Sequence, residues 1–430
     1  PETRLNAGYG TDNSREFFAN RSGGNETSTY NIGFNYFASD GYNFVGDYGP
    51  DLDDDAYENY SLSLNGSHQF SEQFKLSGTF LRTEGTAEFD GYNYIDTRTD
   101  NTQQVITAVA DYAVNDRWNS QLQLGRSDDK NHNYLHDDPV SNPFTETETT
   151  FDTQRDNIIW KNDISIRDSD LLTLGLDYQN DSVDSGVDYA EESRWNRAAF
   201  AQYLYYGDTL DAQLSFRHDN NQAYGSNNSW NIGLGYPLSE SVRLTGTYGT
   251  AFKAPNFNDL YWPNDGFFTG NKDLQPEESS SFDVGLDFTT GPAKWSAHYF
   301  NTQIDNLIAY FFVPYPGVST MENVNTAKID GFELSVSAQW KKWILSSNLS
   351  LIDPRNEETG NQLARRSRRL FNLELDRVLD KWSYGASIVA ASSQYNDSNE
   401  MDLIPGYGIF NIRAAYQFNT RWNLRAKIDN

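Results

Sequence analysis

The sequence contains no cysteine among its 430 residues. Disulfide frameworks, thiolate metal sites and thiol catalysis are therefore all excluded. Basic residues are scarce as well, because 33 Lys and Arg stand against 61 Asp and Glu, which gives a formal net charge of −28. Since phosphate binding depends on Lys and Arg, nucleic acid is not an expected partner.

Long apolar runs are also missing. No run approaches the about 20 residues that a membrane-spanning helix needs, and the mean hydropathy is −0.72. These features exclude a polytopic helical membrane protein but not a membrane β-barrel, whose strands show only weak, alternating hydrophobicity. No catalytic set of Ser, His and Asp and no paired carboxylates stand in a recognisable frame, so we expect neither an enzyme nor a redox cofactor.

Apolar and polar residues alternate along most of the chain. Tyr60, Leu62 and Leu64, for example, are separated by Ser61 and Ser63. A period of two is typical of β-strands whose two faces meet different surroundings. The same pattern recurs at residues 30–36, 332–340 and 422–428.

Ten short turn signals punctuate these strands. They lie near Gly24, Glu72, Asn115, Ser169, Gly207, Glu240, Gly291, Lys341, Asp380 and Asn419. The signals are 33 to 54 residues apart, so each interval must hold two strands and one long loop. Ten turns join twenty strands, and the segment from Arg4 to Tyr9 adds one more.

The fold class that follows is all-β: an antiparallel transmembrane β-barrel of about 22 strands, of which about 21 are present in this chain. Short turns at the periplasmic end and long, acidic loops at the extracellular end are typical of outer-membrane barrels. A soluble β-sandwich array or a β-propeller is the alternative, but propellers lack this regular asymmetry. We expect residues 1–430 to form one barrel domain, with an N-terminal plug domain and the last strand outside this chain.

The stretch from Leu244 to Asp287, LTGTYGTAFKAPNFNDLYWPNDGFFTGNKDLQPEESSSFDVGLD, resembles the barrel signature of TonB-dependent outer-membrane receptors. The segments NTAKIDGFE (Asn325 to Glu333) and LARRSRR (Leu363 to Arg369) agree with it in the expected order. The resemblance covers essentially the whole chain. It implies a monomeric transporter in the outer membrane of Gram-negative bacteria, surrounded by lipid and lipopolysaccharide.

Two acidic segments, GYNFVGDYGPDLDDDAY (Gly41 to Tyr57) and EFDGYNYIDTR (Glu88 to Arg98), resemble neighbouring calcium-binding loops of the cobalamin-transporting branch of that family. Carried over residue by residue, the resemblance places calcium ligands at Asn43, Asp53, Asp55, Asp90 and Asp96. A family aspartate is Asn43 here, and a family tyrosine is Phe89. Calcium takes six to eight oxygen ligands, which two converging carboxylate-rich loops can supply. A solvated acidic loop is the competing interpretation.

Seven aromatic residues lie in predicted loops, where the mouth of a barrel would meet its ligand. Exposed apolar side chains of this kind indicate a binding partner. They are Trp262, Phe267, Phe268, Tyr310, Phe311, Phe312 and Tyr315. They could equally pack loop against loop. The basic run Arg365, Arg366, Arg368 and Arg369 either lines an anionic-substrate path in the lumen or faces lipopolysaccharide phosphates, and the sequence does not choose.

The resemblance implies active import of cobalamin or a related corrinoid, driven by TonB through a plug segment outside these residues. The runner-up substrate is an iron siderophore. Anionic siderophores would favour Arg and Lys at the mouth, whereas the mouth here is acidic. Two other classes use the same fold: a passive porin and a surface adhesin or phage receptor.

Overall fold

A computed structural model describes the chain except for residues 44–52, 91–93, 138–145 and 324–325, together with the side chains of 94–96, 136–137 and 146. Within these described residues, twenty-one strands form one antiparallel sheet. They are β1 (Glu2–Tyr9), β2 (Arg15–Gly24), β3 (Ser28–Ser39), β4 (Tyr57–Gln69), β5 (Phe74–Glu88), β6 (Tyr94–Asn115), β7 (Trp118–Asp137), β8 (Glu146–Arg167), β9 (Asp170–Ser185), β10 (Ser193–Tyr206), β11 (Asp211–Asn221), β12 (Gly225–Ser239), β13 (Val242–Lys253), β15 (Glu277–Thr290), β16 (Ala293–Asp305), β19 (Ala327–Trp340), β20 (Trp343–Asn356), β21 (Arg369–Leu379), β22 (Trp382–Ala391), β25 (Tyr407–Gln417) and β26 (Asn423–Ile428).

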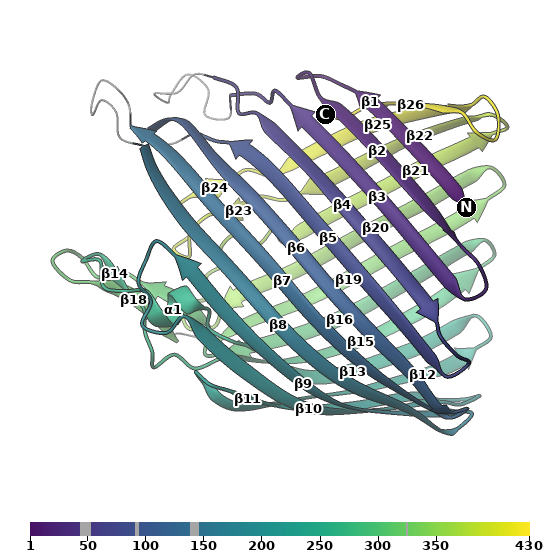
Figure 1. Ribbon diagram of the computed structural model, residues 1–430, viewed down its shortest axis with the longest axis horizontal. Coiled ribbons are helices and arrows are strands. Elements are labelled where there is room, and N and C mark those ends of the chain that lie inside the picture. The colour runs from purple at the N-terminus through teal and green to yellow at the C-terminus, as the bar shows by residue number, and fades with distance from the viewer. Residues whose placement is uncertain (44–52, 91–93, 138–145, 324–325) are drawn as a thin grey trace.

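Each strand from β2 to β25 pairs with the strands that precede and follow it in this order, so the wall is a continuous meander. The sheet curls into a barrel, with β1–β8 on the near side and the later strands behind them (Figure 1). Within the described residues, β1 pairs only with β2 and β26 only with β25. The electrostatic interaction between Glu16 of β2 and Lys427 of β26 indicates that these two edges lie close together.

All ten predicted tight turns are confirmed. At one end of the barrel, connections of two to five residues join the strand pairs from β2–β3 to β25–β26. Several of these turns contain a residue with positive φ, such as Gly291 at 57° and Lys341 at 54°. Two-residue hairpins need such backbone angles to match the twist of their strands.

The strands differ in length around the barrel. β6 and β8 each have 22 residues, whereas about 9 to 11 residues suffice to cross a bilayer. β6 and β8 therefore extend beyond the membrane at the loop end. Part of the chain length that the turn spacing assigned to loops is paired strand instead. In the described part of the chain, no helix is long and apolar enough to span a membrane.

Alternation separates two faces of the wall. On β12, Trp230, Ile232, Leu234 and Tyr236 are exposed on the outer face, and the registers place their neighbours Leu214 and Tyr248 beside Ile232. The large exposed apolar side chains form the outer surface, with aromatic residues above and below aliphatic ones on this strand. This is the pattern of a surface in contact with lipid.

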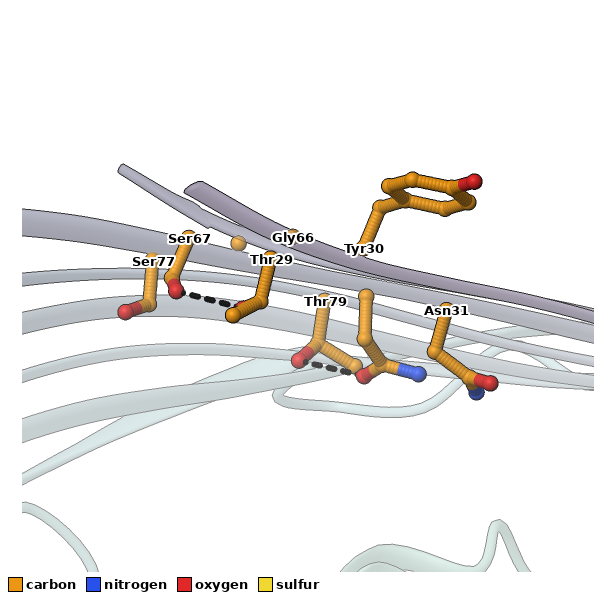
Figure 2. Close-up of a pocket in the computed structure, with 9 residues that line it drawn as sticks. Thr29, Tyr30, Asn31, Gly66, Ser67, Ser77 and Thr79 are labelled. Carbon is orange, nitrogen blue, oxygen red and sulfur yellow. Dashed lines mark hydrogen bonds between the residues drawn. The ribbon is translucent and has the colours of Figure 1, made fainter. Parts of the chain in front are cut away.

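Figure 2 shows the two faces directly on β3, β4 and β5. Thr29, Ser67 and Thr79 point to one side of the wall and Tyr30 to the other. The hydroxyls of Thr29 and Ser67 form a hydrogen bond of 2.8 Å. Hydroxyl and amide groups therefore line a shallow hollow on the inner face of the barrel.

This arrangement predicts different costs for a charge placed on neighbouring residues of β12. Ile232→Arg puts a guanidinium into lipid and should lower the free energy of unfolding by about 2–4 kcal/mol. Asn231→Arg, one residue away, faces the lumen and should change it by less than about 1 kcal/mol. Denaturant titration in phospholipid vesicles measures both values. Equal losses in the two variants would contradict the assignment of faces.

Candidate functional site

The seven aromatic residues predicted to contact a ligand lie in one substructure at the loop end of the barrel. This aromatic module comprises residues 255–274 and 306–323, with 324–325 lying outside the description. It contains α1 (Phe257–Tyr261), β14 (Phe268–Thr269), β17 (Ile308–Phe311) and β18 (Ser319–Asn323). In Figure 1, β14 and β18 extend to the left of the strands, and α1 lies at the strand ends beside them.

A capping box starts α1. The side chain of Asn256 accepts a hydrogen bond from the backbone N–H of Asp259 at 2.9 Å, and the carboxylate of Asp259 accepts one from the N–H of Asn256 at 2.9 Å. Such reciprocal caps stabilise a helix start by about 1 kcal/mol. The chain returns to α1 through Gly270, whose N–H donates to the carbonyl of Trp262. A Cβ at position 270 would lie 2.6 Å from the backbone nitrogen of Trp262, so this close approach requires glycine.

A small three-stranded sheet joins the two loops of the module. β14 pairs in parallel with β18, and β17 pairs antiparallel with β18. The rings of Phe268 and Tyr310 stack with centroids 6.0 Å apart. Some of these side chains therefore do pack loop against loop, and contact of the seven residues with a ligand stays a prediction.

Most of the seven rings remain open to solvent. Phe267 is 73% exposed and Tyr315 is 82% exposed, while Tyr310, Phe311 and Phe312 are exposed to lesser degrees. Trp262 and Phe268 are half-buried. A rigid base therefore presents exposed aromatic faces at the mouth of the barrel, which suits capture of a large, partly apolar ligand.

A small hydrophobic core fixes the module to the barrel wall. Val183 at the end of β9, Tyr189 in the loop after it and Phe257 of α1 are all buried and pack together. The hydroxyl of Tyr189 donates to the Oδ1 atom of Asn258 at 2.5 Å, and burial raises the pKa of this phenol. The ring of Tyr189 also meets Trp262 edge-on, with centroids 6.1 Å apart.

Arg194 of β10 adds a polar anchor to this core. Its Nη1 donates to the carbonyl of Pro255 at 2.6 Å, and its guanidinium carbon lies 4.8 Å from the ring centre of Phe257. The Nε atom is 3.9 Å from the carboxylate of Asp181 on β9. Sequence reasoning missed Arg194 and Tyr189, because neither belongs to a local motif and both act through residues more than 60 positions away.

Asp265 organises the tip of the module and was also missed. Its Oδ1 accepts hydrogen bonds from the backbone N–H groups of Phe267 and Phe268, both at 2.8 Å. Its Oδ2 accepts one from the indole of Trp262 at 3.2 Å. The N–H groups of Phe268 and Phe267 hold the pKa of this carboxyl below its ordinary value. The dipeptide Asp265-Gly266 is a turn signal that could have indicated this role.

These bonds predict a pH dependence for the tip. Because the pKa of Asp265 is lower in the folded loop, its contribution is complete above the ordinary pKa of 3.8 and is lost as the pH falls through the lower, folded value. Hydrogen exchange of residues 262–270, corrected for intrinsic rates, should show roughly tenfold lower protection once the carboxylate is protonated.

Two variants test the source of that effect. Asp265→Asn keeps an oxygen acceptor that does not titrate, so its protection should not change with pH in this range. Asp265→Ala should lack the protection already at neutral pH. A wild-type pH profile retained in Asp265→Asn would contradict the assignment.

The predicted calcium ligands lie on two segments that meet at the same end of the barrel. The N–H of Ala56, which precedes β4, donates to the carboxylate of Glu88 at 3.0 Å. The N–H of Phe89 donates to the carbonyl of Thr97 at 3.1 Å, and this pair stands next to Asp90 and Asp96 in the chain. The two acidic segments are therefore neighbours, as the resemblance requires.

The described residues do not complete a metal site. Asn43, Asp53, Asp55 and Asp90 are described, but the side chain of Asp96 lies outside the described part. Among the described side chains, no group of three or more His, Asp or Glu residues is placed to hold a metal ion. Asp54, which was not a predicted ligand, accepts a hydrogen bond from the backbone N–H of Asn43 at 3.2 Å. The oxygen-only donor set fits calcium in its chemistry, and the ligand set stays a prediction.

Ion pairs cross between strands on the inner face of the barrel. Arg217 of β11 bonds the carboxylate of Asp177 on β9 and that of Asp219 on its own strand, each at 2.9 Å. Arg413 of β25 bonds those of Asp376 and Glu374 at 2.6 and 3.2 Å. Each arginine has two carboxylate partners, so acidic groups remain in excess at both of these places.

A curled antiparallel sheet with an apolar outer face, a polar inner face and large loops at one end defines a β-barrel of the outer membrane. The chain belongs to the family described as TonB dependent receptor-like, beta-barrel, whose model matches residues 2–430. It is therefore an outer-membrane protein of a receptor family. This result confirms the predicted family, fold class and location.

Two relatives are named "Vitamin B12 transporter BtuB". The protein from Photobacterium profundum is 28% identical over 383 residues, which cover 88% of this chain and 61% of the relative. The protein from Vibrio vulnificus is 25% identical over 441 residues, which cover 99% of this chain and 68% of the relative. The chain thus spans about three fifths to two thirds of their length.

Solved structures with the same fold have other names. "Copper transporter OprC" superposes with a TM-score of 0.84 at 16% identity and covers 100% of this chain and 76% of its own. The siderophore receptor PirA from Acinetobacter baumannii superposes with a TM-score of 0.79 at 17% identity, covering 97% of this chain and 73% of its own. At such identities these likenesses show the fold alone.

Proposed function

We propose that this barrel belongs to a TonB-dependent active transporter that captures cobalamin or a related corrinoid at its extracellular loops and imports it into the periplasm. The observation that carries the proposal is the similarity, over 88–99% of the chain, to proteins named as vitamin B12 transporters. Energy coupling would act through TonB and a plug segment outside this chain.

The aromatic module gives this proposal a physical basis. A corrinoid is a large ligand with a flat macrocycle and polar amide edges. Exposed rings such as Phe267, Phe312 and Tyr315 offer apolar faces for the macrocycle, and aromatic contacts of this kind cost little conformational entropy. Because Arg194 and Tyr189 hold the base of the module in place, less ordering is needed when a ligand binds.

Three other functions compete with this proposal. A siderophore receptor would share the fold, but the acidic balance of this chain is unfavourable to anionic siderophores. A passive porin would use the barrel without a plug. A surface adhesin or phage receptor would use the loops alone, and loop deletion would then abolish adhesion and leave uptake intact.

Titration of the full natural protein in detergent tests the substrate. Cyanocobalamin should bind with a dissociation constant of roughly micromolar or tighter, measured by isothermal calorimetry with and without millimolar calcium. A ferric catecholate siderophore is the matched comparison ligand. Absence of cyanocobalamin binding in both conditions, or preferential binding of the siderophore, would overturn the corrinoid assignment.

We further propose that calcium orders the two acidic segments through Asn43, Asp53, Asp55, Asp90 and Asp96. The meeting of the segments at Ala56 and Glu88 supports this idea. Extracellular calcium sites of this kind typically have dissociation constants of about 0.1 to 1 mM. A cation that binds only the ordered loops stabilises them by mass action.

Protease protection measures this ordering. Calcium should slow cleavage within residues 41–57 of the wild type, and the double variant Asp53→Ala with Asp55→Ala should lose that dependence. The control is Asp188→Ala with Glu191→Ala, which removes two exposed acids from the loop between β9 and β10. Unchanged calcium protection in the Asp53 and Asp55 double variant would refute the ligand assignment.

A further inference from the structure

The basic run that follows β20 contributes an arginine to the outer face of the barrel. Arg369 is the first residue of β21 and pairs with Leu351 of β20. Alternation puts Arg369 on the same face as Phe371, Leu373 and Leu375, which belong to the lipid-facing surface. Arg369 is exposed and stands where this apolar stripe ends, at the loop end of the strand.

On the neighbouring strand β20, the outward-facing residues change from apolar to charged at the same level. The outer face of β20 runs through Leu349 and Leu351 and then reaches Asp353 and Arg355. Charged side chains are costly in hydrocarbon. The change from apolar to charged residues on both strands therefore marks the level of the lipid headgroups.

One carboxylate holds two guanidinium groups together at this level. The Oδ2 atom of Asp353 lies 2.8 Å from the Nε of Arg355, and its Oδ1 lies 3.2 Å from Nη2 of Arg368. Glu400 is near enough to Arg355 to interact electrostatically, but its Oε1 accepts a hydrogen bond from the N–H of Gln362 at 2.7 Å.

Guanidinium groups outnumber the carboxylates bonded to them here, and Asp330 of β19, the register partner of Asp353, is itself bonded by Lys328 at 3.2 Å. Arg369 has no ion-pair partner among the described residues, and Arg355 and Arg368 share a single directly bonded carboxylate. All three arginines keep N–H groups beyond those that Asp353 uses, and the side chains of Arg355 and Arg368 are 47% and 40% exposed. In a chain with net charge −28, such a cluster is not a general surface property.

We propose that Arg355, Arg368 and Arg369 form a binding site for a phosphate group on the glycolipid of the outer leaflet. Guanidinium groups bind phosphate through paired, charge-assisted hydrogen bonds. The outward direction of Arg369 and of the Asp353–Arg355 pair favours a lipid over an anionic substrate in the lumen. The apolar stripe directly below the cluster would contact the acyl chains of the same molecule.

The test is binding of bisphosphorylated lipid A to the full natural protein in detergent, followed by native mass spectrometry. Arg368→Gln with Arg369→Gln should weaken binding roughly tenfold, as loss of one strong charged contact does. Removal of the phosphates from lipid A should weaken wild-type binding to a similar degree. Compact migration of the unheated protein on gels checks that the variant folds.

Arg377 provides the matched control. It lies on β21, on the same outer face as Arg369 but at the opposite end of the strand, where it stacks over Trp343. Arg377→Gln should leave lipid A binding unchanged. Equal loss in this control, unchanged binding in the double variant, or equally tight binding of the soluble phosphorylated disaccharide without acyl chains would each overturn the proposal.

Discussion

Pairing of the backbone in hydrocarbon is the constraint on which the rest of this structure depends. A strand in lipid has no water to satisfy its N–H and C=O groups, so each must find a partner in a neighbouring strand. The meander meets this demand with local hairpins for every strand between the two edge strands β1 and β26. Once the wall exists, its pleat sends alternate side chains to lipid and to the lumen. A chain with a mean hydropathy of −0.72 can therefore lie in a membrane, because only every second strand residue must be apolar.

The need to pair backbone groups applies to the barrel strands in lipid and not to the loops outside it. A wall residue such as Ile232 is fixed by pairing on both sides, whereas a loop residue has no such partner. The aromatic module solves this problem with elements of its own: the capped turn of α1, the small sheet of β14, β18 and β17, and the core around Tyr189 and Phe257. Arg194 then connects that core to β10. Exposed rings are held at the mouth because their base is rigid, and not because the rings themselves are buried.

The sequence predicted the wall far better than the module, for a physical reason. Alternation and turn residues are local signals, and each hairpin of the wall joins strands that are adjacent in the chain. The pairing of Phe268 with Ser319 joins segments about 50 residues apart through strands of two and five residues, which leave no periodic trace. One local signal was available, since Asn256 and Asp259 have the spacing of a capping box. For the calcium ligands, the sequence placed two acidic segments that do meet, but a residue pattern cannot specify which oxygen atoms converge.

The wall also explains why barrels of the same fold can have names that refer to different ligands. Proteins named as copper transporters and siderophore receptors superpose on this chain at 16–17% identity, so very different residues build the same barrel. Any residue that keeps the alternation of apolar and polar side chains is compatible with a barrel strand. The sequence of the strands therefore carries little information about the ligand. That information must lie where side chains are free of the lipid constraint: on the inner face, in the loops and in the aromatic module. The acidic loops and exposed rings of this chain are consequently a better guide to its ligand than the shape of its barrel.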